Sequence, residues 1–577
     1  MADRRPPPAN PGRFTKEGYA VSGAWLKQRL TPAGWRALRQ GLTVREKPQP
    51  GAPLAAIRHA RTYECFKYDS ATDVLTLPRR LGTFVDQAAQ EPPGTFGGEP
   101  ALVRRLPPAA CDSGLELYPY QEAYVTHLVE RRLGPAQRRA GTGQVYVHVG
   151  TGRGKTYMLA ALVGRLRVPT LVVVPTLLLQ KDGADLLADV YPALRVERYS
   201  NDLDRRRARS GLPPVTAATA DVVFCVVNTA RSKPRAFFEG YGLVVFDEAH
   251  EYHSPQNSKL LWKAQALCMV GLSATPHDRP DGMDRVVSGF LGKPLPLEEV
   301  VPAGLIENIT FAGRVLEVQY SGHPDFACNV QGANGTTSAI CTIGGVVKDP
   351  HRFEVVAAAV RHLLELHTTL GPAGLDEAGL GPFRLPDGTV TVRQHSVLVF
   401  AEHREYAPAL RDLLSARFPE LNILDDTGAE PVVLRGGATA GEVDAAHRAR
   451  LVLTTYGYSR RGVSLVQMTA MVLATPRRNG LTQILGRIRR LTPDPALRSV
   501  RRVVVDLRDV KVALAAQTSA RRQAYRAEGW PVAKVKANYT DFPVGGGGVF
   551  PAAEEGAGAE AEAEVEVGAA PATLDDL

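Results

Sequence analysis

The stretch that decides the fold is VYVHVGTGRGKT, residues 145–156. It opens with a short apolar run, 145–149, of the kind that forms a buried strand. A second apolar run, 157–163, comes directly after it and predicts a helix. Between the two runs lie Gly150, Thr151, Gly152, Arg153, Gly154, Lys155 and Thr156. A glycine-rich loop that joins a strand to a helix in this way predicts a phosphate-binding loop.

The residue types of this loop suit a nucleoside triphosphate and Mg²⁺. Glycines let backbone N–H groups converge on phosphate oxygens, and the helix N-terminus adds a favourable dipole. We expect Lys155 to reach the β- and γ-phosphates and Thr156 to bind the Mg²⁺ ion. Val149 departs from the general pattern, which has glycine or alanine at that position.

Similar apolar runs recur along the chain after the loop and predict two α/β domains. The first set is VYVHV, TLVVVP, DVVFCVV, GLVVFD and CMVGLS, and the second is SVLVFA, RLVLTT, AMVLAT and RVVVDL. Continuous apolar strands that alternate with helical segments are typical of parallel sheets covered on both faces. We therefore predict one domain over 110–295 and a second over 300–515.

The rest of the chain divides by composition. A Pro- and Arg-rich start is expected to be disordered, and helical and strand-like pieces after it predict a small α+β domain. An insertion, a C-terminal extension and a disordered acidic tail complete the chain. In chain order these five segments are 1–14, 15–95, about 320–350, 516–545 and 546–577.

The charge balance favours a polyanionic partner. The 577 residues carry a net charge of +9, yet residues 537–577 hold nine acidic residues and no Lys or Arg, which leaves +18 on 1–536. Neutralised phosphates release counterions, so a basic body suits nucleic acid. A solvated basic surface without a partner is the alternative.

Other composition features narrow the class of protein. No apolar run approaches the roughly 20 residues that cross a bilayer, and the start lacks the apolar stretch of a signal peptide. We therefore expect an intracellular protein without a membrane partner. The six cysteines are scattered without paired spacing, so no structural metal site is expected.

A second site is predicted where Asp247, Glu248, Ala249 and His250 follow the apolar run GLVVF. Carboxylates at the carboxyl end of a parallel strand lie at the edge where α/β sheets bind ligands. Asp247 can then bind Mg²⁺, and Glu248 can act as the base for the attacking water. Two exposed acids that cap a helix would be the alternative for the pair in isolation.

Two further motifs fit the same reaction. The first, residues 271–276 (GLSATP), again ends an apolar run. The second, residues 483–490 (QILGRIRR), puts Gln483, Arg487 and Arg490 about one turn apart on a helix. Arginines that reach a γ-phosphate neutralise charge in the transition state. A solvated basic helix is the alternative for this motif alone.

Taken together, the ordered motifs over 117–495 resemble those of superfamily 2 helicases of the DExH (DEAH) kind. The set comprises PYQ, VGTGRGKT, LVVVPT, VVNTARS, DEAH, SATP, SVLVFAEHRE, VLTTYGYSRRGVSL and QILGRIRR. LYPYQ and LSATPHDRPDG resemble the branch with the type III restriction motors and a eukaryotic repair helicase. The early segment LKQRL to LPRRLG resembles helicases of nucleocytoplasmic large DNA viruses, such as the poxvirus transcript-release helicase.

This resemblance implies a fold of two tandem RecA-like P-loop domains after a small α+β N-terminal domain, with ATP and Mg²⁺ in the cleft between them. It implies that Gln121 reads the adenine and Tyr118 stacks on it, and that His250, Ser273 and Thr275 couple the two halves. Residues implied to contact the nucleic-acid backbone are Pro175, Thr176, Asn228, Thr229, Thr454 and Thr455. The family often has an acid in its fifth motif, where this chain has Ser464.

The sequence therefore predicts an ATP-dependent nucleic-acid helicase or translocase that acts on DNA, with RNA as a further possible partner. If the protein is viral, the host nucleus or cytoplasm and the virion are its expected locations. Three alternatives stay open: a translocase on duplex DNA that does not separate strands, a nucleotide-gated scaffold that binds nucleic acid, and an RNA remodeller.

Overall fold

A computed structural model describes most of the chain, and all statements of structure below concern its described residues. These are 12–15, 18–47, 62–88, 95–96, 104–264, 266–276, 282–306, 311–331, 337–384, 390–418, 431–436, 438–459, 465–477, 480–489, 494–512, 514–545 and 549–550.

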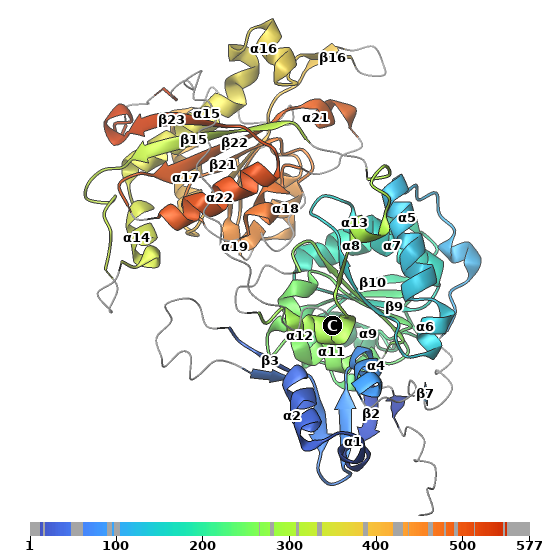
Figure 1. Ribbon diagram of the computed structural model, residues 1–577. Coiled ribbons are helices and arrows are strands. Elements are labelled where there is room, and N and C mark those ends of the chain that lie inside the picture. Colours follow the sequence, from blue (N-terminus) through green and yellow to red (C-terminus); the bar gives the residue numbers. More distant parts are fainter. Residues whose placement is uncertain are drawn as a thin grey trace, which may run out of the picture. The chain divides into compact units, whose positions relative to one another are not determined.

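The first large sheet has seven strands in the order β10-β11-β9-β12-β13-β8-β14, and all of its pairings are parallel (Figure 1). All five apolar runs that the sequence placed here are strands. They are β8 (Gln144–His148), β9 (Thr170–Val174), β11 (Val222–Val226), β12 (Leu243–Phe246) and β13 (Cys268–Ser273). The edges are β10 (Val196–Tyr199) and β14 (Pro294–Pro296).

Helices cover both faces of this sheet. Its central strands are therefore buried along their whole length. One face packs against α5 (Pro119–His127), α7 (Lys155–Leu166), α8 (Leu177–Val190) and α13 (Leu297–Val300). The other packs against α10 (Val227–Ser232), η3 (Arg235–Phe238), η4 (Ala249–His253), α11 (Ser258–Lys263) and α12 (Arg285–Leu291). Shorter pieces are η1 (Pro108–Cys111), η2 (Leu128–Arg132), α6 (Pro135–Arg139) and α9 (Asn201–Arg209).

The second large sheet repeats the topology of the first. Its order is β19-β20-β18-β21-β22-β15-β23, again all parallel, so the strands of the two sheets correspond one to one in chain order. The four predicted runs are β18 (Val397–Ala401), β20 (Leu451–Thr455), β21 (Ala470–Leu473) and β22 (Arg502–Asp509). The others are β15 (Gly313–Ser321), β19 (Val432–Leu434) and β23 (Val532–Asn538).

Both faces of the second sheet are also covered. On one face, α15 (Pro350–Thr369) and α17 (Tyr406–Arg417) bury the larger core. On the other, α22 (Ala515–Ala527) binds β22 through a hydrogen bond from Tyr525 to Asp506 of 2.8 Å. Smaller helices are α14 (Ala339–Val346), α16 (Pro372–Glu377), α18 (Ala440–Ala446), α19 (Tyr456–Ser459), α20 (Leu481–Leu485), α21 (Pro495–Ser499) and η6 (Tyr539–Asp541). A small hairpin joins β16 (Pro382–Arg384) to β17 (Val390–Val392).

The segment 516–545 is more than an extension. Its strand β23 pairs with β15 and completes the second sheet, because the alternating sequence VAKVKAN suits an edge strand with one buried face. Within the predicted insertion, the described residues begin with the end of β15 and include α14.

The N-terminal region has its own five-stranded sheet, in the order β5-β6-β2-β1-β7. Its strands are β1 (Arg13–Thr15), β2 (Gly18–Ser22), β5 (Lys67–Asp69), β6 (Val74–Leu77) and β7 (Thr95–Phe96). Its helices are α1 (Gly23–Arg29), α2 (Pro32–Gly41) and α4 (Arg79–Ala88), and β3 (Thr43–Arg45) pairs with β4 (Thr62–Glu64). Arg13 and Phe14, expected to be disordered, pair with β2 instead. Residues 1–11 lie outside the described part.

The chain forms two compact units. The first comprises Met1–Thr310, Gly457–Val466 and Thr482–Pro493, and the second comprises Phe311–Tyr456, Gln467–Leu481 and Asp494–Leu577. Two short segments that the sequence placed in the second domain therefore group with the first unit. No helix in the described part is long and apolar enough to cross a membrane.

Candidate active site

The predicted phosphate-binding loop has the backbone that its glycines permit. It leaves β8 at His148 and enters α7 at Lys155. Gly152 and Gly154 have φ values of 81° and 75°, in the left-handed region that favours glycine. A Cβ on Gly154 would lie 2.3 Å from Nε2 of Gln121, so no other residue fits there without displacing that amide. The loop is thus shaped by glycine at both positions.

Gln121, predicted to read adenine, is held against this loop. Its side chain is buried, and its Oε1 accepts a hydrogen bond of 3.0 Å from the backbone N–H of Tyr118. Its Nε2 donates to the carbonyl oxygen of Arg153 at 3.1 Å. The amide is therefore fixed in place by the protein, and its bond to Arg153 ties it directly to the phosphate-binding loop.

Tyr120 is a residue of this site that the sequence reasoning missed. Its hydroxyl donates to the Arg153 carbonyl at 3.2 Å, and its ring lies nearly parallel to that of Tyr118, with centroids 5.9 Å apart. The Arg153 guanidinium lies 5.8 Å from the same ring. The motif PYQ gave only a partial indication of this role. The hydroxyl of a tyrosine usually has a hydrogen-bond partner when the side chain is buried.

Asp247 and Glu248 follow β12 at the carboxyl edge of the first sheet. The Asp247 N–H donates to the carbonyl of Val173 on β9, which fixes the carboxylate beside that strand. Burial and the neighbouring Glu248 raise the pKa of Asp247, while Lys155 acts in the opposite direction. Such a carboxyl group gains from a nearby cation, because a positive charge favours its ionised form.

Glu248 adopts an unusual backbone conformation, with a φ of 46° at a non-glycine residue. Strained positions of this kind persist where the surrounding structure enforces them, and they gather at functional sites. The conformation turns the chain into η4 and leaves Oε2 of Glu248 3.5 Å from Nδ1 of His250.

A chain of polar contacts continues from His250. Its Nδ1 lies 3.0 Å from Oγ of the fully buried Ser273, and that oxygen accepts a hydrogen bond of 3.1 Å from the N–H of Thr275. The Gln483 amide donates to the Thr275 hydroxyl at 2.7 Å. The structure therefore brings together four of the predicted residues, from three motifs, within the first unit.

The motif around Arg487 also approaches the loop. A Cβ on Gly486 would lie 2.3 Å from Cγ2 of Thr151, so glycine at 486 allows this close packing. Arg487 itself is buried. Arg490 lies outside the described residues, as does Ser464.

The residues predicted to contact nucleic acid fall into two groups. Pro175 and Thr176 follow β9, and Asn228 and Thr229 follow the neighbouring β11, so all four lie at one edge of the first sheet. Asn228 is exposed, whereas the Thr176 hydroxyl caps α8 by accepting a bond from Leu179 N at 3.3 Å.

Thr454 and Thr455 belong to the second unit and are both buried. The Thr454 hydroxyl donates to the Leu434 carbonyl at 2.8 Å. This bond uses the hydroxyl proton of Thr454 to hold β20 against β19. The apolar strand that carries these threonines explains the burial, because its side chains are enclosed along its whole length.

The donor set at the carboxyl edge fits Mg²⁺. Thr156 is exposed on the first turn of α7 and offers a hydroxyl oxygen, and Asp247 offers a carboxylate with a raised pKa. Oxygen ligands of these two kinds, completed by water and phosphate, are those that Mg²⁺ prefers.

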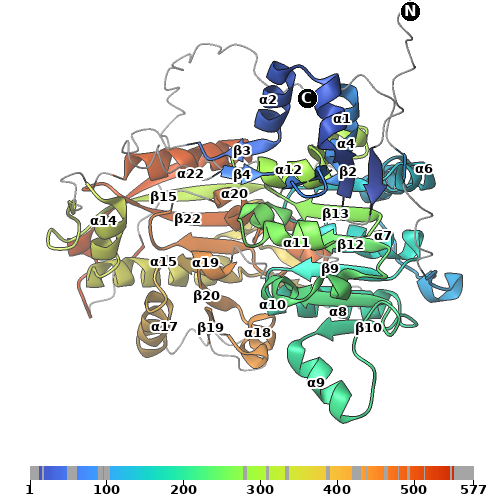
Figure 2. The same ribbon diagram turned by 90° about the horizontal axis from the view of Figure 1, so that it is seen from below.

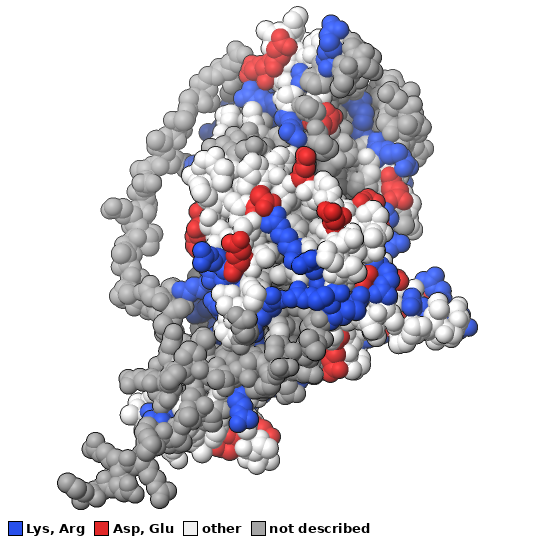
Figure 3. All heavy atoms as spheres, turned by 90° about the vertical axis from the view of Figure 1, so that its right-hand side faces the viewer, with Lys and Arg blue, Asp and Glu red and all other residues white. Residues whose placement is uncertain are grey.

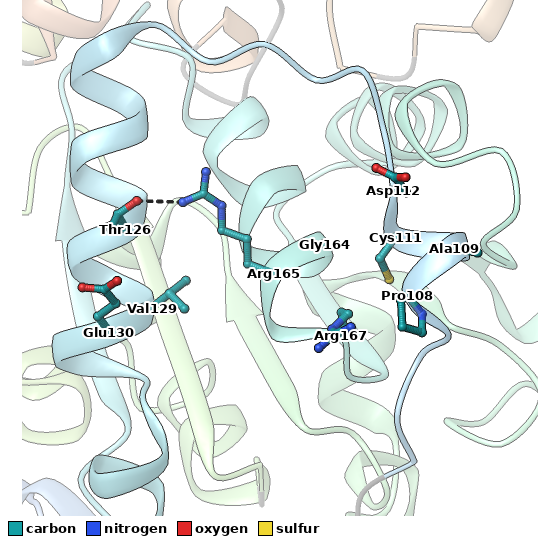
Figure 4. Close-up of a pocket in the computed structure, with 10 residues that line it drawn as sticks. All are labelled: Pro108, Ala109, Cys111, Asp112, Thr126, Val129, Glu130, Gly164, Arg165 and Arg167. Carbon is teal, nitrogen blue, oxygen red and sulfur yellow. Dashed lines mark hydrogen bonds between the residues drawn. The ribbon is translucent and has the colours of Figure 1, made fainter.

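A cavity of about 600 Å³ lies at the opposite end of α7 (Figure 4). Gly164 and Arg165 of α7 and Arg167 directly after it line the cavity, together with Asp112 directly after η1 and Glu130 of η2. Arg165 donates to the Thr126 hydroxyl at 2.8 Å. Since α7 begins at the phosphate-binding loop and this cavity lies near its last turn, the cavity is separate from the predicted nucleotide site.

Comparison with known proteins places the chain in a family. Residues 114–278 match the model of the type III restriction enzyme, res subunit. The chain is 37% identical over 444 residues to “Putative ATP-dependent RNA helicase QP509L” of African swine fever virus (isolate Tick/Malawi/Lil 20-1/1983), which covers 77% of this chain and 79% of the relative. It is 29% identical over 149 residues to “Putative helicase 055L” of Frog virus 3, covering 25% of this chain and 31% of the relative.

The chain therefore belongs to the superfamily 2 helicases, in the family of large DNA virus helicases that includes the swine fever virus protein. It is an ATP-dependent helicase of this type, with two RecA-like domains. Among solved structures, S. cerevisiae Dbp5 bound to RNA and ADP BeF3 is similar over 74% of this chain and 90% of its own, at 12% identity and a TM-score of 0.44. Nothing about function follows from a likeness at that level.

Proposed function

We propose that the chain couples ATP hydrolysis at the loop 150–156 to movement along nucleic acid. The observation that carries the proposal is the chain of contacts from Glu248 through His250, Ser273 and Thr275 to Gln483. It links the proposed catalytic carboxylate to a motif 235 positions later in the sequence. Such a chain can report the state of the nucleotide to the rest of the motor.

In this proposal each residue of the site has a defined task. Lys155 binds the β- and γ-phosphates, and Thr156 and Asp247 bind Mg²⁺, which neutralises charge on the phosphates when it is present. Glu248 accepts a proton from the water that attacks the γ-phosphorus. Arg487 and Arg490 stabilise the charge that develops on the transferring phosphoryl group. Gln121 and Tyr118 contact the adenine.

The nucleic acid is proposed to contact the chain through its phosphate backbone. Pro175, Thr176, Asn228 and Thr229 lie at the ends of adjacent strands, where hydroxyl and N–H groups can bind phosphates without reading bases. The net charge of +18 on residues 1–536 supports a polyanionic track. A band of Lys and Arg side chains also crosses the face shown in Figure 3.

DNA is the first candidate substrate, supported by the match of residues 114–278 to the restriction-enzyme model. RNA is the second, and the name of the swine fever virus relative favours it. Backbone contacts serve either sugar. The experiment is therefore a comparison of ATP turnover with single-stranded DNA, duplex DNA and RNA at equal nucleotide concentration. No stimulation by any of the three would overturn the proposal.

Two further assays distinguish the proposed helicase activity from a duplex-DNA translocase and from a nucleotide-gated scaffold. A motor that tracks on duplex DNA without separating it would displace a third strand from a triplex but leave a fork intact. A nucleotide-gated scaffold would bind nucleic acid in an ATP-dependent way with negligible turnover. The proposal expects fork unwinding together with turnover that depends on nucleic acid.

A further inference from the structure

An exposed arginine-rich helix at the edge of the first sheet is not accounted for by the nucleotide site. Helix α9 has the sequence NDLDRRRAR and follows the edge strand β10. None of its residues is fully buried, and Leu203 alone among its hydrophobic residues packs against the core of the first unit. Isolated helices of nine residues are marginal in water, which means that this one depends on specific contacts for its order.

Polar contacts at its base supply that order. The Ser200 hydroxyl caps the helix by accepting a bond from Leu203 N at 3.1 Å. The Asp204 carboxylate accepts bonds from the Tyr199 hydroxyl and, at 3.2 Å, from the N–H of Val215. Arg207 donates to the Pro213 carbonyl at 2.8 Å. The helix and the loop after it are thus fixed as one arm, residues 200–215, seen beside β10 and α10 in Figure 2.

The arm starts at the edge that carries the proposed nucleic-acid contacts. In the parallel register, Tyr199 aligns with Cys225, and Cys225 aligns with Val173. Asn201 comes two residues after this level, as do Val227 and Pro175 in the two other segments. Adjacent strands are about 4.8 Å apart and β9 lies two strands from β10, so the carboxyl ends of β10, β11 and β9 lie within roughly 10 Å of one another.

A direct contact also joins α9 to the end of α10, the helix that contains Asn228 and Thr229. Lys233 follows α10, and its Nζ lies 3.8 Å from Oδ2 of Asp204 and 4.6 Å from the centroid of the Tyr199 ring. Lys233 therefore ties the arm to the end of α10. The arm extends the proposed track outward, past the edge strand.

Two arginines of the arm are available for a ligand. Arg206 pairs with Asp202 at 3.0 Å, and Arg207 is 3.5 Å from Glu197. Arg205 and Arg209 are exposed, and neither has an ion-pair partner among the described residues. They are four positions apart, and side chains at that spacing lie on one face of a helix about 6 Å from each other. That spacing suits phosphates of nearby nucleotides in one strand.

We propose that α9 is a phosphate-binding arm that contacts nucleic acid beside the carboxyl edge of the first sheet, through Arg205 and Arg209. The inference rests on the proposed function and deepens it, since it adds a contact that none of the motifs contains. The contact is made to the phosphate backbone and not to bases. Two exposed guanidinium groups on a short helix can neutralise phosphate charge, but their side chains are not held in place to recognise base edges.

The test is the salt dependence of nucleic-acid binding by the full chain. In R205A/R209A, two lost phosphate contacts should lower the slope of log affinity against log salt by about 1.4 on a single strand and about 1.8 on a duplex. ATP turnover at saturating nucleic acid should stay at the parental value. Fluorescence anisotropy with labelled thymidine and uridine homopolymers and a DNA duplex gives the slopes.

Two matched variants control for charge. R131A/R167A removes two exposed arginines of the first unit, one in η2 and one directly after α7, and should leave the slope unchanged. R205K/R209K keeps the charge and should restore most of the slope. Alanine has a high helix propensity, so the substitutions in α9 preserve the helix.

An unchanged slope in R205A/R209A, or an equal drop in R131A/R167A, overturns the arm while leaving the proposed function intact. Polyglutamate serves as an additional anionic probe. If R205A/R209A weakens the binding of polyglutamate but not of nucleic acid, the arm is overturned as a nucleic-acid contact and an acidic protein is the indicated partner. If the parent binds no nucleic acid, the proposed function itself fails.

Discussion

The two large sheets share one topology but differ at the position where a nucleotide would bind. In the first unit, β8 is followed by the glycine loop and the open N-terminus of α7. In the second, the corresponding strand β15 is followed by residues whose polar groups turn toward Asp349, the N-cap of α15. Asp349 accepts bonds from the Tyr320 hydroxyl at 2.7 Å, from His323 N at 3.2 Å and from His351 N at 3.0 Å.

A protein carboxylate thus caps the helix that follows the first strand of the second unit, whereas the corresponding helix of the first unit begins at the loop proposed to bind phosphate. The two units also differ after the corresponding strands β12 and β21. Asp247 follows β12, but Ala474 follows the corresponding β21, and its carbonyl accepts a bond of 2.7 Å from the Arg352 side chain. The comparison teaches that the fold alone does not make a nucleotide site; a few residues after the strands do.

The largest effect is expected from Lys155→Ala. It removes the cation nearest the β- and γ-phosphates, so nucleic-acid-stimulated ATP turnover should fall to background. A control change in the second unit is Arg477→Ala, which breaks the 2.9 Å pair with Glu402. That variant should still bind ATP. Near-normal turnover by Lys155→Ala would contradict the proposal that the loop of the first unit is the nucleotide site.

A second large effect is expected from Arg487→Ala. A finger arginine acts mainly on the transition state, and such residues contribute about 10³–10⁵ in rate. Turnover should therefore fall much more than ATP affinity, as measured by single-turnover hydrolysis beside nucleotide binding. An Arg487→Ala enzyme that loses ATP binding but keeps its turnover rate would show that this arginine has another role.

A moderate effect on stability is expected from Asp349→Ala. The change removes a helix cap and leaves the buried Tyr320 hydroxyl without its acceptor, which costs about 1–3 kcal/mol. Denaturant unfolding should show this loss, and Tyr320→Phe should show a smaller one. ATP affinity should be unchanged in both, because this carboxylate only caps a helix of the second unit. A large change in ATP affinity would contradict the comparison.

The smallest effect is expected from Ser273→Ala. A neutral hydrogen bond contributes about 1 kcal/mol, so basal ATP turnover should change by less than about tenfold. Stimulation by nucleic acid should fall further than basal turnover, because Ser273 joins His250 to Thr275. Equal losses in both rates would indicate a purely structural serine.

The sequence predicted the central strands of both sheets because those strands are continuous apolar runs. It missed β15, since Glu317 interrupts the run and lies almost fully buried. That charge is tolerated because Arg522 donates two bonds of 2.8 Å to its carboxylate and Arg508 a third of 3.2 Å. Burial alone would raise the pKa of Glu317, but these arginines outweigh it and lower the pKa. Partners 191 or more positions away cannot be read from local pattern.

In the candidate site too, some features could be predicted from local sequence and others depend on distant residues. The loop glycines, Asp247 and Glu248 could be predicted, because each stands next to an apolar strand. The burial of Thr454 and the tie between Gln121 and Arg153 could not, because both depend on packing between separate elements. The left-handed backbone of Glu248 was equally invisible, since a glutamate gives no sequence signal for it.

The most direct test of the account is Glu248→Gln. The amide keeps the shape of the side chain but cannot accept a proton from the attacking water, so single-turnover hydrolysis should slow by about 10²–10⁴. Lys155, Thr156 and Asp247 remain, so ATP affinity should survive. The ATP-dependent change in nucleic-acid affinity, followed by anisotropy, should then persist for as long as ATP stays bound. Hydrolysis within about threefold of the parent would show that Glu248 is not the base, and the proposed mechanism would be wrong.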